Sequence, residues 1–152
     1  MNDVAVFSQR MIELLPQLMR GVTRHESNAL SRGVITLPQL WAMECVSRRD
    51  DCSMHELAAT LGISRPAATG LMDRLVANGL ARRTGDTADR RVVRVTITAK
   101  GRRVVRDIWT QKRRAIAHVF GRLSAQDRTD YLRILERVVK TLGDGKATAN
   151  GV

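Results

Sequence analysis

Residues 53–98 constrain the fold more than any other stretch of this chain, because capping and turn residues divide them into short elements of fixed order. Ser53 and Glu56 form a capping box, in which each side chain binds a backbone N–H of the other residue, so a helix is predicted to begin here. It is expected to end at Leu61, since the following Gly62 favours a helix terminus. A second helical pattern follows directly after this glycine-containing turn.

The second helix is expected to begin after its N-cap, Ser64, and to end near Asn78 and Gly79. At roughly 100° per residue its apolar residues share one side; they are Ala68, Leu71, Met72 and Leu75. The opposite side carries Pro66, Thr69, Gly70 and Asp73, flanked by Arg65 and Arg74. Because this side has little bulk near the start of the helix, we expect it to fit into a groove.

Two strands follow, from Leu80 to Arg83 and from Val92 to Thr98, and the second alternates apolar and polar residues. The polar segment from Thr84 to Asp89 is expected to form the loop between them. Residues 53–98 are therefore predicted to form a helix-turn-helix followed by a β-hairpin wing.

Helical patterns precede this unit. The first runs from about Val4 to Val22, and Pro16 is expected to kink it or to mark the start of its main segment. The second begins with a capping box formed by Thr36 and Gln39. Apolar residues, including Trp41, occur on most of its sides, so we expect it to be largely buried.

Helical patterns also follow the hairpin. Thr98 is expected to cap a long helix that reaches Phe120, and Ser124 to open a last helix that ends near Leu142. Residues 143–152 are expected to form a frayed tail.

The chain is strongly basic, since 26 Lys and Arg residues oppose 15 Asp and Glu residues, for a net charge of +11. Nine basic residues lie between Arg82 and Arg106, where Asp86 and Asp89 are the acids before Arg106. A folded chain with such an excess usually binds a polyanion, with nucleic acid as the first candidate. Charge alone leaves open a merely basic protein.

Several features indicate a cytoplasmic protein. The sequence has no run of about 18 apolar residues that could cross a membrane. The N-terminus lacks the pattern of a signal peptide. Two cysteines, Cys45 and Cys52, do not form a disulfide framework.

The helix-turn-helix and wing contain segments in a characteristic order. Leu37 and Gln39 come first, followed by Glu56-Leu57-Ala58, Leu61-Gly62-Ile63-Ser64, Leu71-Met72-Asp73-Arg74-Leu75, Asn78-Gly79-Leu80, Arg83, Asp86, Asp89-Arg90-Arg91, Val95-Thr96-Ile97-Thr98 and Gly101. The string from Glu56 to Ser64 alone occurs in many helix-turn-helix proteins, but the whole ordered set is more specific. It resembles the MarR family of winged-helix transcriptional regulators.

This resemblance implies a mainly α (α+β) homodimer that represses genes and releases DNA when a small ligand or an oxidant acts. Its parts would be an N-terminal dimerisation helix and linker (1–35), a winged helix-turn-helix lobe (36–98), C-terminal dimerisation helices (99–142) and a flexible tail (143–152). The expected partners are double-stranded DNA, a second copy and a small aromatic or anionic effector. No cofactor and no membrane contact is expected.

The second helix of the helix-turn-helix supplies the expected base-reading residues. Arg65 could bind guanine bidentately, and Thr69 could contact a base, while Pro66 and Gly70 leave room for close approach. Ser64 could offer its hydroxyl or N–H to a phosphate. Arg74 suits either a phosphate contact or an ion pair with a nearby acid, and the sequence leaves both open.

The wing supplies the remaining DNA-binding candidates. Arg83 belongs to this basic region, and the resemblance implies that an acid orders the wing while an arginine enters the minor groove. Asp89 with Arg90 or Arg91 fits that pattern. Narrow minor grooves attract such an arginine electrostatically.

Other kinds of site find little support. Cys45 is expected in the core, and an acid beside Cys52 should raise the pKa of its thiol, so redox sensing is disfavoured. The three histidines are scattered, which argues against a metal site. Arg24 and Trp41 are weak candidates for an effector site.

Enzyme activity also finds no support, since the chain has no nucleophile elbow, phosphate loop or paired carboxylates. The alternative functions are an activator, a broadly binding chromosomal protein, or a winged-helix protein-interaction module.

Overall fold

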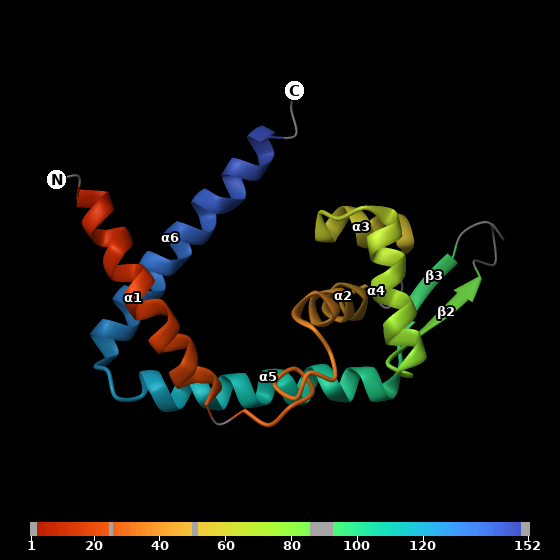
Figure 1. Cartoon of the computed structure of the whole chain (residues 1–152), viewed down its shortest axis with the longest axis horizontal. Helices are drawn as coiled ribbons and strands as arrows, with labels where there is room; N and C mark the ends of the chain where they lie inside the picture. The colour runs from red at the N-terminus through yellow and green to blue at the C-terminus, as the bar shows by residue number, and fades with distance from the viewer. Residues whose placement is uncertain (1–2, 25, 50–51, 86–92, 150–152) are drawn as a thin grey trace. The chain divides into compact units, whose positions relative to one another are not determined.

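The computed structural model describes residues 3–24, 26–49, 52–85 and 93–149 (Figure 1). It divides into two compact units, residues 1–113 and 114–152. The elements of the first unit are α1 (Asp3–Thr23), α2 (Leu37–Ser47), β1 (Cys52–Ser53), α3 (Met54–Leu61), α4 (Arg65–Ala77), β2 (Ala81–Gly85), β3 (Val93–Ile97) and most of α5 (Ala99–Phe120). The second unit holds the end of α5 and α6 (Ala125–Ala149).

Capping boxes begin α2 and α3, as the sequence predicts. The backbone N–H of Thr36 donates to Gln39 Oε1 at 2.8 Å, and the Gln39 N–H donates back to the Thr36 hydroxyl. Ser53 and Glu56 repeat this arrangement at the start of α3. Gly62 then ends α3 in the left-handed region, with φ at +65°. The boundaries of the helix-turn-helix therefore follow from local side-chain chemistry.

The described strands form one antiparallel sheet in the order β1-β3-β2. Arg83 of β2 pairs with Val95 of β3, and Cys52 of β1 pairs with the other side of Val95. The hairpin of β2 and β3 was predicted, although β2 continues two residues beyond Arg83, to Gly85. Strand β1 was not predicted, because two residues are too few to show a strand period.

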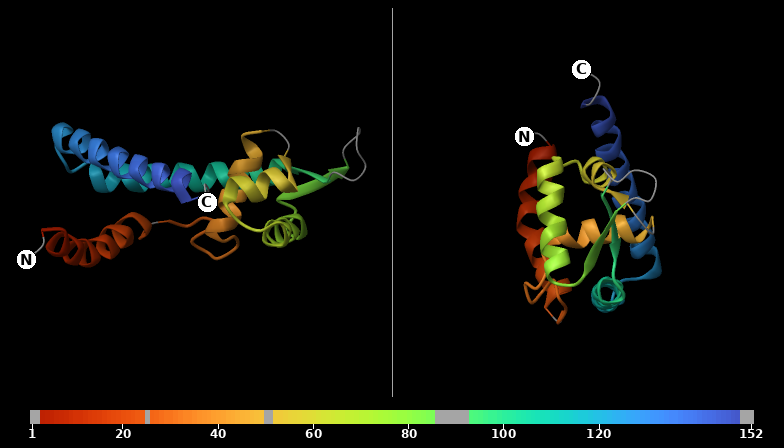
Figure 2. Two further views of the ribbon diagram at one scale, coloured as in Figure 1. Left: turned by 90° about the horizontal axis from the view of Figure 1, so that it is seen from above. Right: turned by 90° about the vertical axis from the view of Figure 1, so that its right-hand side faces the viewer.

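The core of the first unit joins the helix-turn-helix to the sheet and to α5. Its largest fully buried side chains come from six elements and the segment before α2; they are Ile35, Leu40, Met43, Val46, Cys52, Leu57, Met72, Leu75, Val95 and Ile108. The recognition helix α4 lies beside the β2–β3 hairpin (Figure 2). Packing on one side of α4 thus leaves its opposite side for contact with another molecule.

The C-terminal end of α4 is held closely against the start of α5. Gly79 turns the chain at φ +67°, and its carbonyl accepts the Thr98 hydroxyl at 2.8 Å. A Cβ on Gly101 would lie 2.1 Å from the carbonyl oxygen of Leu80, so only glycine fits at this position. The Thr98 hydroxyl also accepts the Gly101 N–H, which confirms Thr98 as the cap of α5.

Two predictions about the helices need correction. Trp41 is 51% exposed, because the buried residues of α2 occupy the side of the helix opposite to it. Helix α6 continues to Ala149 rather than ending near Leu142. Helix α1 is continuous from Asp3 to Thr23, with Pro16 inside it.

Within the described part of the chain, no helix combines the length and the apolar character that crossing a membrane requires.

Candidate nucleic-acid interface

Helix α4 presents the exposed surface that the sequence predicts. Ala68, Met72 and Leu75 are fully buried on its inner side. The residues expected to face a groove are all exposed; they are Arg65, Pro66, Thr69, Gly70 and Asp73. A Cβ on Gly70 would meet no atom within 4 Å, so this glycine relieves no clash inside the protein. The small residues on this side leave the helix backbone open to close approach.

The N-terminus of α4 is capped by Ser64, whose hydroxyl oxygen accepts the Ala67 N–H at 3.3 Å. The hydroxyl hydrogen is still able to donate, because a serine hydroxyl both accepts and donates. Arg65 follows at the first position of the helix, where its side chain is exposed. In this first turn Pro66 has no N–H and the Ala67 N–H binds Ser64, which leaves the Arg65 N–H to bind an anion together with the positive charge of the Arg65 side chain.

An ion pair connects α4 to the wing. The Arg83 guanidinium lies 2.7 Å from a carboxylate oxygen of Asp73, and both side chains are partly exposed. Asp73 belongs to α4 and Arg83 to β2, so the pair links the hairpin to α4. Arg83 remains a predicted DNA-binding residue, and its guanidinium is already paired with an acid of α4.

Only some of the remaining predicted DNA-binding residues belong to the part of the chain that the structure describes. Asp89, Arg90 and Arg91 lie outside the described residues. Arg74 is exposed and forms no ion pair with any acid that the structure describes.

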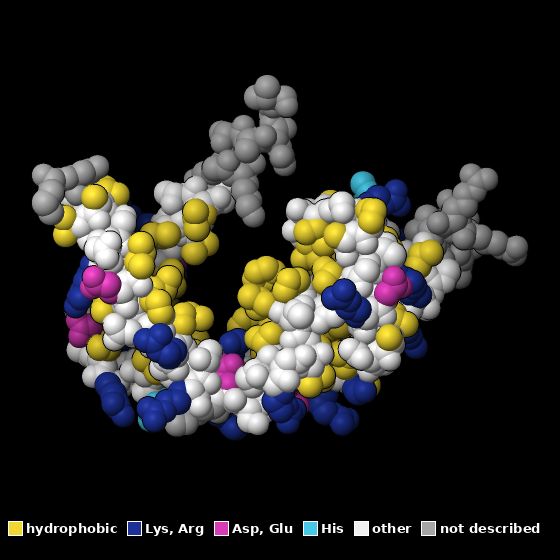
Figure 3. Space-filling view, viewed as in Figure 1, with side chains coloured by type: hydrophobic (Ala, Val, Ile, Leu, Met, Phe, Trp, Pro, Cys, Tyr) yellow, Lys and Arg dark blue, Asp and Glu magenta, His cyan; other side chains and the backbone are white. Residues whose placement is uncertain are grey.

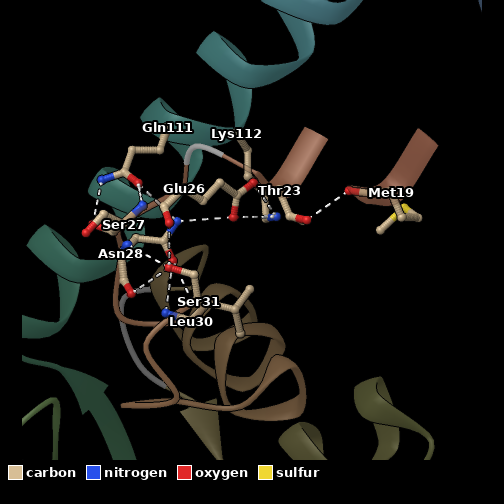
Figure 4. Close-up of polar contacts among 9 residues, drawn as sticks. All are labelled: Met19, Thr23, Glu26, Ser27, Asn28, Leu30, Ser31, Gln111 and Lys112. Atoms are coloured by element: carbon tan, nitrogen blue, oxygen red, sulfur yellow. Dashed lines mark hydrogen bonds and ion pairs between the residues drawn. The ribbon is translucent and has the colours of Figure 1, made fainter. Parts of the chain in front are cut away.

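A partly buried polar cluster, which we call the clasp, holds the segment after α1 against α5 (Figure 4). Lys112 Nζ lies 3.1 Å from Glu26 Oε1, and the Glu26 side chain is only 3% exposed. Asn28 Nδ2 donates to Glu26 and to Gln111. The Gln111 side chain exchanges two hydrogen bonds with the backbone of Ser27. No local sequence pattern indicates the clasp, because the residues that it joins from the two segments lie more than 80 positions apart.

Trp41 lines an open cavity of about 280 Å³ between α2 and α3. Arg48 and Arg49, just after α2, also line it, whereas Arg24 does not. The Glu44 side chain, at the edge of the cavity, accepts a hydrogen bond from the indole N–H of Trp109. The sequence did not single out these two arginines, because no local pattern shows that they lie beside a cavity.

The two cysteines differ in environment. Burial raises the pKa of the Cys52 thiol above its ordinary value, and the neighbouring Cys45 and Glu56 raise it further. The sequence predicted the direction from a nearby acid, but burial is the larger cause. Among the described residues, no group of three or more His, Cys, Asp or Glu side chains could hold a metal ion.

Comparison with known proteins shows which family this chain resembles. Residues 35–93, which hold α2 to the start of β3, match the sequence model described as "MarR family". Over these residues the chain is similar to the MarR family. MarR-family proteins are transcription regulators, which confirms the prediction of a regulator rather than an enzyme.

Relatives of this chain include proteins described as regulators and repressors. It is 30% identical over 91 residues to the HTH-type transcriptional regulator YsmB of Bacillus subtilis, covering 60% of this chain and 62% of YsmB. It is 29% identical over 112 residues to the HTH-type transcriptional repressor Rv2887 of Mycobacterium tuberculosis, covering 74% of this chain and 81% of Rv2887.

Solved MarR-like structures share the fold across most of the chain, which confirms the predicted winged helix. Streptococcus pneumoniae FabT, solved in complex with DNA, has a TM-score of 0.75 at 16% identity, covering 93% of this chain and 99% of FabT. Bordetella bronchiseptica BpsR, whose DNA binding is regulated by 6-hydroxynicotinic acid, has a TM-score of 0.61 at 21% identity, covering 91% of this chain and 94% of BpsR.

Proposed function

We propose that this MarR-family chain is a homodimeric transcriptional repressor that binds a pseudo-palindromic operator in double-stranded DNA. A small aromatic or anionic effector would control its release. The observation that carries the proposal is the exposed side of α4, where Arg65 and Thr69 stand beside residues with little bulk. An α-helix with this profile fits the major groove of DNA and can reach base edges.

The charge of the protein supports DNA as the partner. The net charge of +11 favours the phosphate backbone, and Arg65 and Arg74 are exposed on α4 itself. Arg65 would read guanine, Thr69 would contact a neighbouring base, and Ser64 and Arg74 would bind phosphates. Arg90 or Arg91 would enter the minor groove. FabT, which shares the fold, was solved with DNA.

Exposed apolar side chains support a homodimer. Hydrophobic side chains gather along α1 and along α6 (Figure 3). On α1, Val4 and Phe7 are each more than 60% exposed, and on α6 Leu142 is 68% exposed. Apolar stripes of this kind on a folded chain mark a protein interface, and a second copy of the same chain is the partner we propose. Sedimentation should therefore give twice the chain mass of 17.0 kDa, and a mass of one chain would contradict the dimer.

The proposals of repression and of control by an effector are supported by similar proteins. Rv2887 is described as a repressor, and the DNA binding of BpsR is regulated by a small aromatic acid. A chain with this function would act in the cytoplasm, where it meets DNA. An activator would bind DNA through the same residues, so only a transcription assay separates the two.

A gel-shift assay with DNA upstream of the chain's own gene tests the proposal. We expect Arg65→Ala and Thr69→Ala to weaken binding by about tenfold or more each, since a good base contact contributes about 1–3 kcal/mol of discrimination. Arg32→Ala, which removes an exposed arginine from the loop before α2, is the matched control and should bind like wild type.

The salt dependence gives a second readout. If the dimer makes about 6–10 phosphate contacts, its affinity should fall roughly 10³- to 10⁵-fold between about 50 and 200 mM salt. A flat salt response, or full binding by both α4 variants, would contradict the proposed DNA interface. If the wild-type protein does not bind DNA at all, a protein-interaction module would be favoured instead.

A further inference from the structure

The outward side of α5 carries arginines that the proposed function does not use. Within residues 99–113, Gly101 and Ile108 are buried on the inner side of this helix, and the opposite side is exposed. Exposed arginines follow that opposite side at helical spacing over roughly 16 Å, and we call them the arginine row; they are Arg102, Arg103, Arg106 and Arg113. Figure 3 shows Lys and Arg side chains along the lower edge of the view, where α5 lies.

Most donors of the arginine row are left unused by the protein itself. Within the part of the chain that the structure describes, Arg103 and Arg106 form no hydrogen bond or ion pair. Arg102 donates to the carbonyl of Ile97, and Arg113 donates to a hydroxyl one turn earlier. Each of these bonds uses one N–H, whereas a guanidinium has five. The row therefore keeps most of its N–H groups for another molecule.

The charge pattern of the row differs from that of an ordinary solvated helix. Exposed helices usually alternate charges of opposite sign, as on α6, where the Arg133 guanidinium lies 2.8 Å from the Asp130 carboxylate. In α5, Arg106 instead follows Arg102 by four positions and Arg103 by three. Like charges at these spacings repel each other and destabilise a helix. A polyanionic partner would remove this repulsion.

The composition of the row favours nucleic acid over a protein or a membrane. A guanidinium fork matches a phosphate, and a DNA duplex presents about one phosphate charge per 1.7 Å of its axis. Protein interfaces depend on large buried anchors, and a membrane-bound helix needs an apolar side. Besides the arginines, the outward side holds Ala99, Asp107 and Thr110, none of which is such an anchor. Trp109 lies at its edge, where the indole N–H donates to Glu44.

The arginine row and the recognition helix face different directions. Met72 of α4 and Ile108 of α5 belong to one core, so the exposed sides of both helices point away from it. The right view of Figure 2 shows α4 along one side of this core and α5 end on below it. DNA has a persistence length of about 50 nm, so a duplex bound by α4 would need a strong bend to reach the row. A second duplex can reach it without bending.

We infer that the arginine row binds the phosphate backbone of a second DNA duplex while α4 holds the operator. The inference rests on the proposed function for the first duplex only. Phosphates are the same at every base pair, so the second duplex is bound without regard to its sequence. One protein molecule can thus join two separate segments of DNA.

A bridging assay with the full-length protein tests this inference. The protein is bound to its upstream DNA on beads, unbound protein is washed away, and a labelled duplex of unrelated sequence is added at low salt. We expect wild type to capture the labelled duplex. The double variant Arg103→Gln and Arg106→Gln should capture it at least about tenfold more weakly, because two phosphate contacts are lost from each row. Its salt slope of capture should be smaller by about two units per row.

Two controls separate the row from general effects of charge. The double variant Arg24→Gln and Arg32→Gln removes the same charge from exposed positions outside the row and should capture the duplex like wild type. In gel shifts with the upstream DNA alone, both double variants should also bind like wild type. Glutamine favours helices about as well as arginine does, so α5 is expected to keep its structure, which urea denaturation checks.

The outcomes that overturn the inference are distinct. They are the absence of capture by wild type, equal capture by the row variant, and a matching loss of its affinity for the upstream DNA, which would assign the row to the operator. Displacement by polyglutamate as efficient as by unlabelled DNA of equal charge would favour an acidic protein and also overturn it.

A last measurement distinguishes failure of this inference from failure of the proposed function. If wild type does not bind its upstream DNA, the unrelated duplex is titrated alone by fluorescence anisotropy. Binding that is weakened in the row variant would then support the arginine row, although the proposed function would be wrong. Binding that is equal in wild type and the row variant would contradict both.

Discussion

Replacement of Gly101 by alanine tests the junction between α4 and α5. The added Cβ would lie 2.1 Å from the Leu80 carbonyl oxygen and 2.6 Å from Ile97 Cγ2, well inside ordinary contact distance. The Leu80 carbonyl accepts the Thr98 N–H at 3.0 Å, so the strand cannot move away without weakening that hydrogen bond. The substitution therefore strains a junction where α4, the sheet and α5 meet.

The expected cost combines three contributions. Overpacking a tight site costs about 1–3 kcal/mol, and loss of the backbone hydrogen bond adds about 1 kcal/mol. Alanine is better than glycine inside a helix by about 1 kcal/mol, which offsets part of the loss. We expect Gly101→Ala to lower the free energy of unfolding by about 1–3 kcal/mol. Urea denaturation followed by far-UV circular dichroism, at one fixed protein concentration, measures it.

Gly70→Ala provides the matched control, because it is the same substitution in a helix where the new methyl group meets nothing. It should raise the free energy of unfolding by up to about 1 kcal/mol. It should also weaken operator binding, since the methyl group would stand between α4 and the groove. If Gly101→Ala were as stable as wild type, the close approach of Leu80 would not constrain this position and the reasoning would be wrong.

Three further predictions concern polar contacts. Glu26→Gln should lower the free energy of unfolding, measured by urea denaturation, by about 1–3 kcal/mol, because Lys112 loses its carboxylate partner. Replacement of both residues by apolar ones should cost less than the sum of the two single changes. Arg83→Ala and Asp73→Ala should each change stability by less than about 1 kcal/mol, since both side chains are partly exposed. In gel shifts, however, their effects on DNA affinity should not add if the pair positions the wing. The backbone N–H of Ser53, at the start of α3, lowers the pKa of the Glu56 carboxyl below its ordinary 4.5. The ionised carboxylate therefore stabilises the folded protein above that pH, and this stabilisation is lost as the pH falls through the lower pKa of the folded state. Glu56→Gln should flatten this acid limb in a pH series, and an unchanged limb would exclude the carboxylate as its source.

Features set by neighbouring residues could be read from the sequence. The capping boxes at Thr36 and Ser53, the end of α3 at Gly62 and the cap at Thr98 were all predicted, because each depends on residues within one turn. The apolar side of α4 was predicted for a related reason, since helical geometry fixes which of its residues share a face.

Features set by packing could not be read in this way. Trp41 was expected in the core because α2 is apolar on most sides, yet only one side of α2 packs inward. The cavity beside it depends on how α2 and α3 meet, and no local pattern encodes that. Arg83 looked like a simple DNA contact until its partner Asp73, ten positions earlier, was located.

The clasp also has a consequence for the order of folding. Glu26 and Lys112 are 86 positions apart, and the whole helix-turn-helix and the wing lie between them. Closing so long a loop is entropically costly until the intervening segments have folded and brought its ends together. We therefore expect the winged helix to form first and the clasp to close late. Loss of the clasp should accordingly speed unfolding and leave the folding rate almost unchanged.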